Sequence, residues 1–275
     1  MNKTILIAAT LLFGSNLLNA QKDKNNPDYK GFYKDVTVQS PEAQLTFENA
    51  VSKIEYSKFK MIVKNKTNDY LIYKPSESVF KLGGKTFKPQ EKELFIEPLQ
   101  SDWKTIDIKS DGTNMNTDEF SFEVNGLYSM ATPGKVIEAA NFALPAKVND
   151  FKVGDKFTCN VTKVVKETKV TEVTFECKYL GTDYGIIRPI KAVVKLENGQ
   201  EYATSDLKAK TKFLKQGESE KISVEFKIPK GAADMQFANM EIVWKDTFSE
   251  SKLKALPKQE AKMVLDPGMT AGKNK

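Results

Sequence analysis

The strongest constraint in this 275-residue sequence is an internal repeat at a spacing of 114 residues. Residues 45–82 align with residues 159–196 without a gap. In the most similar part, 69–82 against 183–196, seven of fourteen positions are identical, where ordinary composition gives roughly one. Both copies carry the segment Asp-Tyr-x-Ile-x-Lys/Arg-Pro and then a glycine-containing turn. The repeat predicts two domains built alike rather than one large sheet.

Short alternating runs of apolar and polar residues follow one another from Val36 onward. Examples are 58–63, 105–109, 120–124 and 222–226, each rich in Val, Ile, Phe or Thr and bounded by turn residues. A period of two is typical of a half-buried strand. We therefore predict an all-β protein made of two tandem β-sandwich domains.

The first twenty residues have the three-part pattern of a secretory signal. Lys3 lies near the start, an apolar run covers 5–13, and Ala20 ends the segment with a small residue. The apolar run is too short for a permanent membrane span, and no later stretch is long enough either. A buried N-terminal helix is the alternative. The pattern predicts a cleaved signal peptide and a secreted or periplasmic protein without a membrane span.

Composition shifts divide the rest of the chain. Pro133, Gly134 and Pro145 mark a connection between the two repeats, and the C-terminal residues are polar. The expected segments are a signal peptide at 1–20, a polar leader at 21–35, domain 1 at 36–130, a linker at 131–149, domain 2 at 150–250 and a flexible tail at 251–275.

The sequence contains no histidine, which removes the commonest general base and the commonest nitrogen ligand for metals. The formal net charge is +6, but Arg188 is the sole arginine and no basic cluster stands out. Nucleic-acid readers depend on arginine for bidentate contacts. We find no nucleophile or cofactor motif. The composition therefore favours a non-enzymatic protein without catalytic residues, metal, cofactor or nucleic-acid partner.

The two cysteines lie within one predicted hairpin. If 159–165 and 171–177 pair around Thr168, then Cys159 lies opposite Cys177 on a mainly apolar face. Two cysteines placed this way in an exported chain predict a disulfide. Two buried free thiols are the alternative.

The same register makes further predictions about facing pairs. Val161 should face Phe175, and Val165 should face Thr171. In the first repeat the equivalent pairs are apolar: Leu45 with Val63, and Phe47 with Met61. A slip of one residue would place the sulfurs on opposite faces.

The repeated Asp-Tyr segment has two interpretations. In the structural one, Asp caps a turn, Tyr and Ile pack in the core, and Pro sits at a bend. In the functional one, Asp69, Tyr70, Asp183 and Tyr184 form a duplicated ligand-binding patch. The structural interpretation is favoured, because repeats preserve what packs.

Two other features are candidates for ligand contact. The segment 107–119 is oxygen-rich, with carboxylate or amide side chains at Asp107, Asp111, Asn114, Asn116, Asp118 and Glu119. Calcium prefers such ligands, but the spacing does not match the known calcium loop, so a solvated turn is favoured. Trp103 and Trp244 are able to stack on sugars, yet each lies in an alternating segment where it can instead be core.

The second repeat resembles the telokin-like, immunoglobulin-like domains of exported bacterial proteins. The resemblance rests on Phe151-Lys-Val-Gly-Asp155, on the turn Glu197-Asn-Gly199, and on Gly217-Glu218 before a late strand. It covers 146–246, and reaches 36–125 only through the repeat. It implies a sandwich fold and a role in adhesion, ligand capture or assembly, and it carries over no functional residue.

These observations lead to a ranked set of hypotheses. The first is an exported binding, adhesion or envelope-assembly protein that acts through β-sandwich surfaces and exposed strand edges. Its partner would be another envelope or surface protein, or a glycan. The second is a carbohydrate-binding or glycan-processing accessory protein. The third is a hydrolase that uses carboxylates alone.

Overall fold

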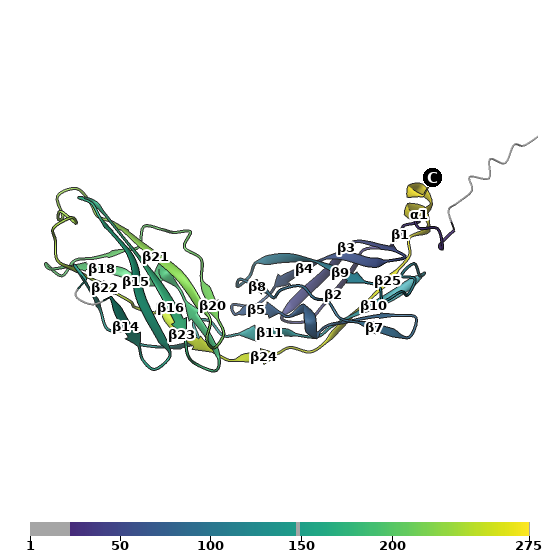
Figure 1. Cartoon of the computed structure of the whole chain (residues 1–275), viewed down its shortest axis with the longest axis horizontal. Helices are drawn as coiled ribbons and strands as arrows, with labels where there is room; N and C mark the ends of the chain where they lie inside the picture. Colours follow the sequence, from purple (N-terminus) through teal and green to yellow (C-terminus); the bar gives the residue numbers. More distant parts are fainter. Residues whose placement is uncertain (1–22, 147–148, 275) are drawn as a thin grey trace, which may run out of the picture.

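The computed structural model describes residues 23–146 and 149–274, so the predicted signal peptide lies outside the described residues. Nearly all elements are strands in antiparallel sheets, as predicted. Two β-sandwiches follow one another along the longest axis of the molecule (Figure 1). Within the described ranges, no helix is both long enough and apolar enough to cross a membrane.

Domain 1, as we use the name from here, is the sandwich that contains most of the first repeat. Its strands are β1 (Gly31–Phe32), β2 (Val36–Gln39), β3 (Ala43–Lys53), β4 (Tyr56–Asn65), β5 (Tyr70–Tyr73), β6 (Val79–Leu82), β7 (Lys85–Phe87), β8 (Leu94–Ile96), β9 (Ser101–Lys109), β10 (Glu119–Val124), β11 (Leu127–Met130), β24 (Leu253–Ala255) and β25 (Gln259–Val264). One sheet has the order β1-β3-β4-β9, with β2 also on β3. The facing strands form the sheets β25-β10-β6-β7 and β24-β11-β5-β8.

Domain 2 repeats this plan. Its strands are β12 (Lys135–Val136), β13 (Phe142–Leu144), β14 (Asp150–Val153), β15 (Phe157–Lys166), β16 (Val170–Tyr179), β17 (Tyr184–Ile187), β18 (Val193–Leu196), β19 (Glu201–Ala203), β20 (Lys212–Leu214), β21 (Ser219–Lys227), β22 (Met240–Val243) and β23 (Phe248–Ser251). The sheets are β14-β15-β16-β21, β13-β22-β18-β19 and β12-β23-β17-β20.

The predicted repeat appears in the bounds of the elements. β5 and β17, the short 3-10 helices η1 (Pro75–Glu77) and η2 (Pro189–Lys191), and β6 and β18 are all offset by 114 residues. Two longer turns in domain 2 then raise the offset, to 116 at β19 and 118 at β20 and β21. Each prolyl residue begins its 3-10 helix, where it needs no backbone donor.

Alternating burial explains why these segments form sandwiches. Along β4, every second side chain points into the core, including Phe59, Met61 and Val63, all at most 1% exposed. These side chains pack against Phe80 and Phe122 from the facing sheet. Removing such apolar surface from water stabilises each sandwich. Domain 2 has its own core, in which Trp244 is 1% exposed and stacks on Phe151.

The flexible tail was expected at 251–275, but the described residues 251–274 form ordered structure instead. β24 pairs with β11, β25 pairs with β10, and the helix α1 (Pro267–Lys273) follows. Ala261 and Met263 on β25 are fully buried in the domain 1 core. The prediction was wrong because the tail is polar on one face only, and its partner strands lie more than a hundred residues earlier in the chain.

The expected linker at 131–149 also contains strands. β12 pairs with β23 and β13 pairs with β22, so both complete domain 2. Their places match those of β24 and β25 in domain 1 at an offset of 119 residues: Phe142 lies opposite Ile242 as Ala261 lies opposite Phe122. Each repeat therefore gives its last two strands to the other repeat. We call this arrangement the reciprocal strand exchange.

The expected polar leader at 21–35 is also partly built into domain 1. β1 pairs with the end of β3, and Tyr29 and Tyr33 are at most 3% exposed. The C-terminal helix locks this segment: the Asn274 side chain donates to the Lys30 carbonyl (2.7 Å) and accepts from the Lys30 amide (2.9 Å). As a result, β1 and α1 lie together at the end of domain 1 that is remote from domain 2 (Figure 1).

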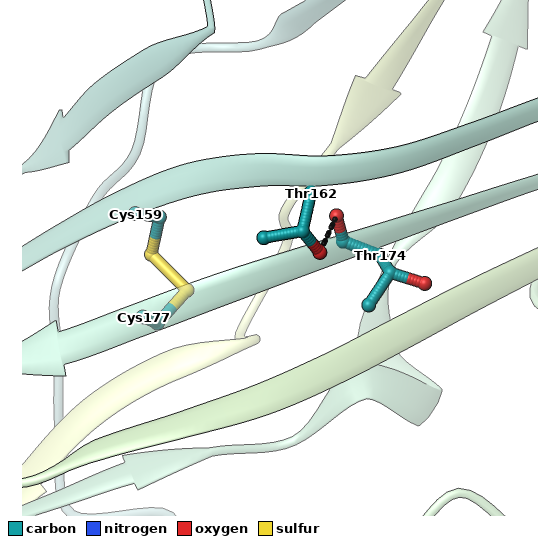
Figure 2. Close-up of a disulfide and its surroundings, with 4 residues drawn as sticks. All are labelled: Cys159, Thr162, Thr174 and Cys177. Atoms are coloured by element: carbon teal, nitrogen blue, oxygen red, sulfur yellow. Dashed lines mark hydrogen bonds between the residues drawn. A yellow bond between two sulfur atoms is a disulfide. The ribbon is translucent and has the colours of Figure 1, made fainter.

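The predicted disulfide between Cys159 and Cys177 is present and fully buried (Figure 2). Cys159 pairs with Cys177 and Val161 with Phe175, as the hairpin register predicts. In domain 1 the pairs Leu45 with Val63 and Phe47 with Met61 are also confirmed.

The predicted pair of Val165 with Thr171 is wrong. A bulge at Thr162 shifts the register, so that Val165 faces Glu172. The Thr162 hydroxyl donates to the Thr174 carbonyl (3.2 Å), which holds the extra residue in place (Figure 2). A register symmetric about Thr168 therefore holds beyond the bulge, at the sulfurs, and fails between the bulge and the turn.

Candidate functional site

Tyr70 and Tyr184, two of the four candidate residues, lie where the two domains meet. Each is 8% exposed, and with Ile72, Ile186 and Met130 they form a third apolar cluster between the two cores. The hydroxyl groups are also engaged, Tyr70 with the Thr211 hydroxyl (3.2 Å) and Tyr184 as donor to the Glu93 carboxylate (3.4 Å). Burial, followed by the nearby Glu93 charge, raises the pKa of Tyr184.

Aromatic contacts across this interface have an approximate twofold arrangement. Tyr70 packs edge-on against Phe213, with ring centroids 4.9 Å apart, and Tyr184 packs edge-on against Phe95 at 6.4 Å. Phe95 and Phe213 are equivalent in the repeat, at the middle of β8 and β20, and stack on each other at 4.6 Å with an interplanar angle of 3°. Each domain thus offers the same patch to the other, as in an isologous dimer.

The two aspartates of the repeated segment have separate surroundings. Asp69 accepts hydrogen bonds from the Thr132 amide (3.1 Å) and the Ser129 hydroxyl (3.4 Å), and so holds the start of the crossing from domain 1 to domain 2. Asp183 lines a shallow cavity of about 620 Å³ together with Glu250 and Lys252. The four candidate residues therefore serve the domain junction. The structure does not bring them into one exposed patch.

One flank of the interface is closed by an ion pair between the two domains. The Glu93 carboxylate accepts from Lys215 Nζ at 2.8 Å as well as from the Tyr184 hydroxyl. Lys74 Nζ lies 5.6 Å from the Tyr184 ring centroid and 4.8 Å from that of Tyr128. Such cation–π contacts also stabilise this flank of the interface.

The opposite flank is open. At the 118-residue offset, Glu93 corresponds to Thr211 and Lys215 corresponds to Glu97, so no ion pair forms there. A cavity of about 480 Å³ remains between the domains, which we call the interdomain cavity. Its lining consists of Tyr70, Phe95, Glu97, Gln100, Ser101, Asp102, Lys210, Thr211 and Phe213. Aromatic walls with a polar rim are typical of small-molecule sites.

The sequence did not predict the aromatic half of this site. Phe95 and Phe213 lie beyond residue 82, where the ungapped alignment at 114 residues ends. If the two repeats are aligned again after the glycine-containing turn, at an offset of 118 residues, Phe95 aligns with Phe213.

Four carboxylates of the oxygen-rich segment 107–119 form ion pairs with lysine side chains. Its ion pairs are Asp107 with Lys109 (2.8 Å), Asp111 with Lys85 (3.3 Å), Asp118 with Lys24 (2.5 Å) and Glu119 with Lys262 (2.8 Å). Hydrogen bonds from Thr113 and then Lys85 lower the pKa of Asp111. Over residues 23–146 and 149–274, no group of three or more ligating side chains is placed to hold a metal ion.

The two tryptophans differ in exposure. Trp244 packs in the domain 2 core against Phe175 and Phe248. Trp103 is 55% exposed on the edge strand β9, next to Asp102 of the interdomain cavity, with Lys60 Nζ 5.3 Å from its ring centroid. Only Trp103 is therefore available for contact with a partner.

A cavity of about 700 Å³ on domain 1 is a weaker candidate. It lies over the β25-β10-β6 sheet, and its rim includes Lys81, Glu119, Glu260 and Lys262. Glu119 pairs with Lys262 (2.8 Å), and Lys81 lies 3.9 Å from Glu260. Because these charges neutralise one another, little recognition chemistry remains.

Comparisons with known proteins give no family. No protein-family model and no curated protein matches the chain. Among solved structures, the YadV chaperone aligns over 72% of this chain and 92% of its own, with 10% identity and a TM-score of 0.19. A conserved domain protein from Bacillus anthracis aligns over 85% and 92%, with 9% identity and a TM-score of 0.22. At these TM-scores the likenesses carry no argument about function.

Proposed function

We propose that this chain is an exported, non-enzymatic binding protein that serves adhesion or envelope assembly in the periplasm or outside the cell. The signal-like N-terminus and the buried disulfide both support export, because disulfides persist in oxidising compartments. Its partner would be another envelope or surface protein, or a glycan.

The reciprocal strand exchange is the observation that carries this proposal. Two chain crossings, 131–134 and Lys252, join the domains, and the flanking strands pair with each other on both sides. Gly134 adopts φ +78°, and a Cβ there would lie 2.6 Å from the Glu250 carbonyl oxygen, so the crossings pack closely. Together with the aromatic interface, this makes one elongated body suited to presenting a surface at a distance.

The end of domain 2 remote from domain 1 is the surface we assign to partner contact. There the β15–β16 turn meets the loop 228–239, with the Met235 amide donating to the Thr168 carbonyl (3.0 Å). Phe237 on this loop is 75% exposed. A large exposed aromatic side chain on a loop that is anchored to a rigid scaffold is a common recognition element.

Three carboxyl groups are held in the charged form by neighbouring donors. Hydrogen bonds, chiefly from lysine or hydroxyl groups, lower the pKa of Asp111, Glu123 and Glu225. A glycosidase acid needs a raised pKa, so these three carboxyl groups do not suit that role. They give the hypothesis of a carboxylate-only hydrolase no support.

We keep the telokin-like immunoglobulin resemblance as the proposed family. Two-layer antiparallel sandwiches in both domains support it. The reciprocal strand exchange is a departure from a simple tandem arrangement, in which each domain is completed by its own continuous segment.

Site-specific photocrosslinking in the native cell envelope tests the proposal. A photoreactive phenylalanine in place of Phe237 should give a discrete crosslinked band with one partner. The matched control replaces Met269, which is 48% exposed on α1 at the opposite end of the molecule. Absence of any crosslink from Phe237, or equal bands from both positions, would contradict a binding surface at the end of domain 2.

A carbohydrate-binding accessory role is the second candidate. The interdomain cavity favours it, because this cavity combines aromatic walls with carboxylate, amide and hydroxyl groups.

A further inference from the structure

We propose that the interdomain cavity is a binding site for a short saccharide of one or two rings. This inference rests on the carbohydrate-binding candidate of the proposed function and names a ligand class and a place for it. The volume of about 480 Å³ lies within the range of small-molecule sites, roughly 300–1,000 Å³.

The walls of the cavity supply an apolar surface. Phe95 and Phe213 are half-buried and form one stacked pair, and Tyr70 packs edge-on against Phe213. The C–H groups of a pyranose ring pack well on aromatic side chains, which are apolar across the ring and, in tyrosine, polar at one tip. The stacked pair is fixed by contacts from both domains, so it is preorganised before a ligand arrives.

The rim supplies hydrogen-bonding groups in excess. The side chains of Glu97, Gln100 and Lys210 make no hydrogen bond or ion pair with any residue in 23–146 or 149–274. Asp102 accepts only from the adjacent Trp103 amide, at 2.7 Å. Two carboxylates, an amide and an ammonium group together match the hydroxyl groups of a sugar, which both donate and accept.

The charge of the rim argues against anionic ligands. Glu97 and Asp102 contribute two negative charges, while Lys210 contributes one positive charge. Phosphate or carboxylate ligands would therefore meet net repulsion. Neutral and N-acetylated saccharides remain as the class with both the required hydroxyl groups and no negative charge.

The closed flank shows how the second copy of the aromatic patch differs from the open one. There the ion pair of Lys215 with Glu93 fills the position that corresponds to the interdomain cavity. The repeat offers the same aromatic patch twice, and two residue differences, Thr211 for Glu93 and Glu97 for Lys215, leave one copy open.

The test uses the full mature chain and defined probes: glucose, galactose and N-acetylglucosamine, with cellobiose, lactose and chitobiose. Each is titrated while amide NMR signals of 100–102 and 210–213 and the fluorescence of Trp103 are followed. At least one probe should shift both groups of signals saturably. Glu97→Gln should weaken that probe about tenfold, because a hydrogen bond to a charged group is lost.

A double variant copies the closed flank onto the open one. Glu97→Lys with Thr211→Glu should form the ion pair seen between Lys215 and Glu93, fill the cavity and abolish saccharide binding while leaving the thermal midpoint of unfolding near that of the parent. The control Asp155→Asn changes a carboxylate that is 85% exposed and does not line the interdomain cavity, and should bind as the parent does.

Two results would overturn the inference. One is that none of the six probes shifts the signals of 100–102 and 210–213; the other is that the double variant binds as tightly as the parent. Either result leaves the crosslink from the end of domain 2 unaffected, so the failure of this site is distinguishable from the failure of the proposed function.

Discussion

Domain 1 and domain 2 share a strand plan but hold it together in different ways. The central hairpin of domain 1 carries Leu45 opposite Val63, whereas that of domain 2 carries the disulfide between Cys159 and Cys177. Domain 1 is closed by a strand that arrives after the whole of domain 2, and domain 2 by a strand that precedes the rest of it. The comparison shows that equivalent positions in a hairpin accept either a disulfide or a pair of apolar side chains. It also shows that a sandwich of this plan can be completed by a strand that comes before or after the rest of its domain in the sequence.

The largest effect should come from removing β24, β25 and α1 by ending the chain at Lys252. Domain 1 would lose a strand that pairs over six residues with β10, together with the buried Ala261 and Met263. We expect domain 1 to lose its slowly exchanging amides in hydrogen-exchange measurements while domain 2 keeps them. The control ends the chain at Asp266, which keeps β25, and should preserve the protection of β10. Equal protection of β10 in the two shortened chains would contradict the reciprocal strand exchange.

A smaller effect is expected from the disulfide. Replacing Cys159 and Cys177 together by alanine should cost domain 2 about 3 kcal/mol, because the closed loop restricts the unfolded chain. Replacing them by leucine and valine, the pair found at Leu45 and Val63, should recover part of that loss through packing. Urea unfolding followed by Trp244 fluorescence measures both, and the unfolding of domain 1 should not change. Equal losses in the two variants would mean that packing at this position contributes nothing.

The interface offers a test of equivalence. Phe95→Ala and Phe213→Ala each remove one ring of the stacked pair, so each should lower the free energy of unfolding by a similar amount, about 1–2 kcal/mol. Calorimetry on the two variants and on the double variant measures this. The double variant should cost less than the sum, because either single change already removes the stacking. Additive losses would show that the two rings act independently.

The smallest effect concerns pH and separates the two domains. Glu123 accepts from Lys81 (2.8 Å), Asn125 and Lys258, and these bonds, that from Lys81 first, lower its pKa from 4.5 to about 2. A lowered carboxyl pKa gives a stabilisation that is present above about pH 4.5 and is lost as the pH falls toward 2. The contribution should be under about 1 kcal/mol, because surface ion pairs are weak.

The variant Glu123→Gln should remove this part of the acid sensitivity of domain 1. Domain 2 has Val243 at the equivalent position, so it should show no matching change. Thermal unfolding of parent and variant between pH 2 and pH 6 measures the difference. A parent-minus-variant difference that stays constant over this range would rule out the effect.

Local sequence patterns predicted much of the fold. Alternation along 58–63 and 222–226 identified strands β4 and β21, because side chains on a strand point to opposite faces in turn. The facing of Cys159 and Cys177 was predictable because both lie at alternating positions on the mainly apolar face of one hairpin, at equal distances from Thr168. The bulge at Thr162 was not predicted, because the local sequence pattern does not mark an extra residue that is held by a hydrogen bond to the neighbouring strand.

The candidate site was predicted only in part. Tyr70 and Tyr184 were identified through the repeat, but their place at a domain junction was not, and neither were Phe95 and Phe213. Aromatic residues in alternating segments look alike in sequence whether they enter a core or an interface. The polar rim around Glu97 and Lys210 gave no pattern at all, because its members come from two domains more than a hundred residues apart.

The sequence by itself determined that this protein is built from strands, that the same package occurs twice, and that its two cysteines face each other. These properties depend on periodicity and on neighbours along the chain. Only the tertiary structure decided which repeat receives each terminal strand and which flank of the interface stays open. Those outcomes depend on contacts between distant segments: a polar-looking tail becomes a core strand once β10 offers its free edge, and a single missing ion pair leaves a cavity.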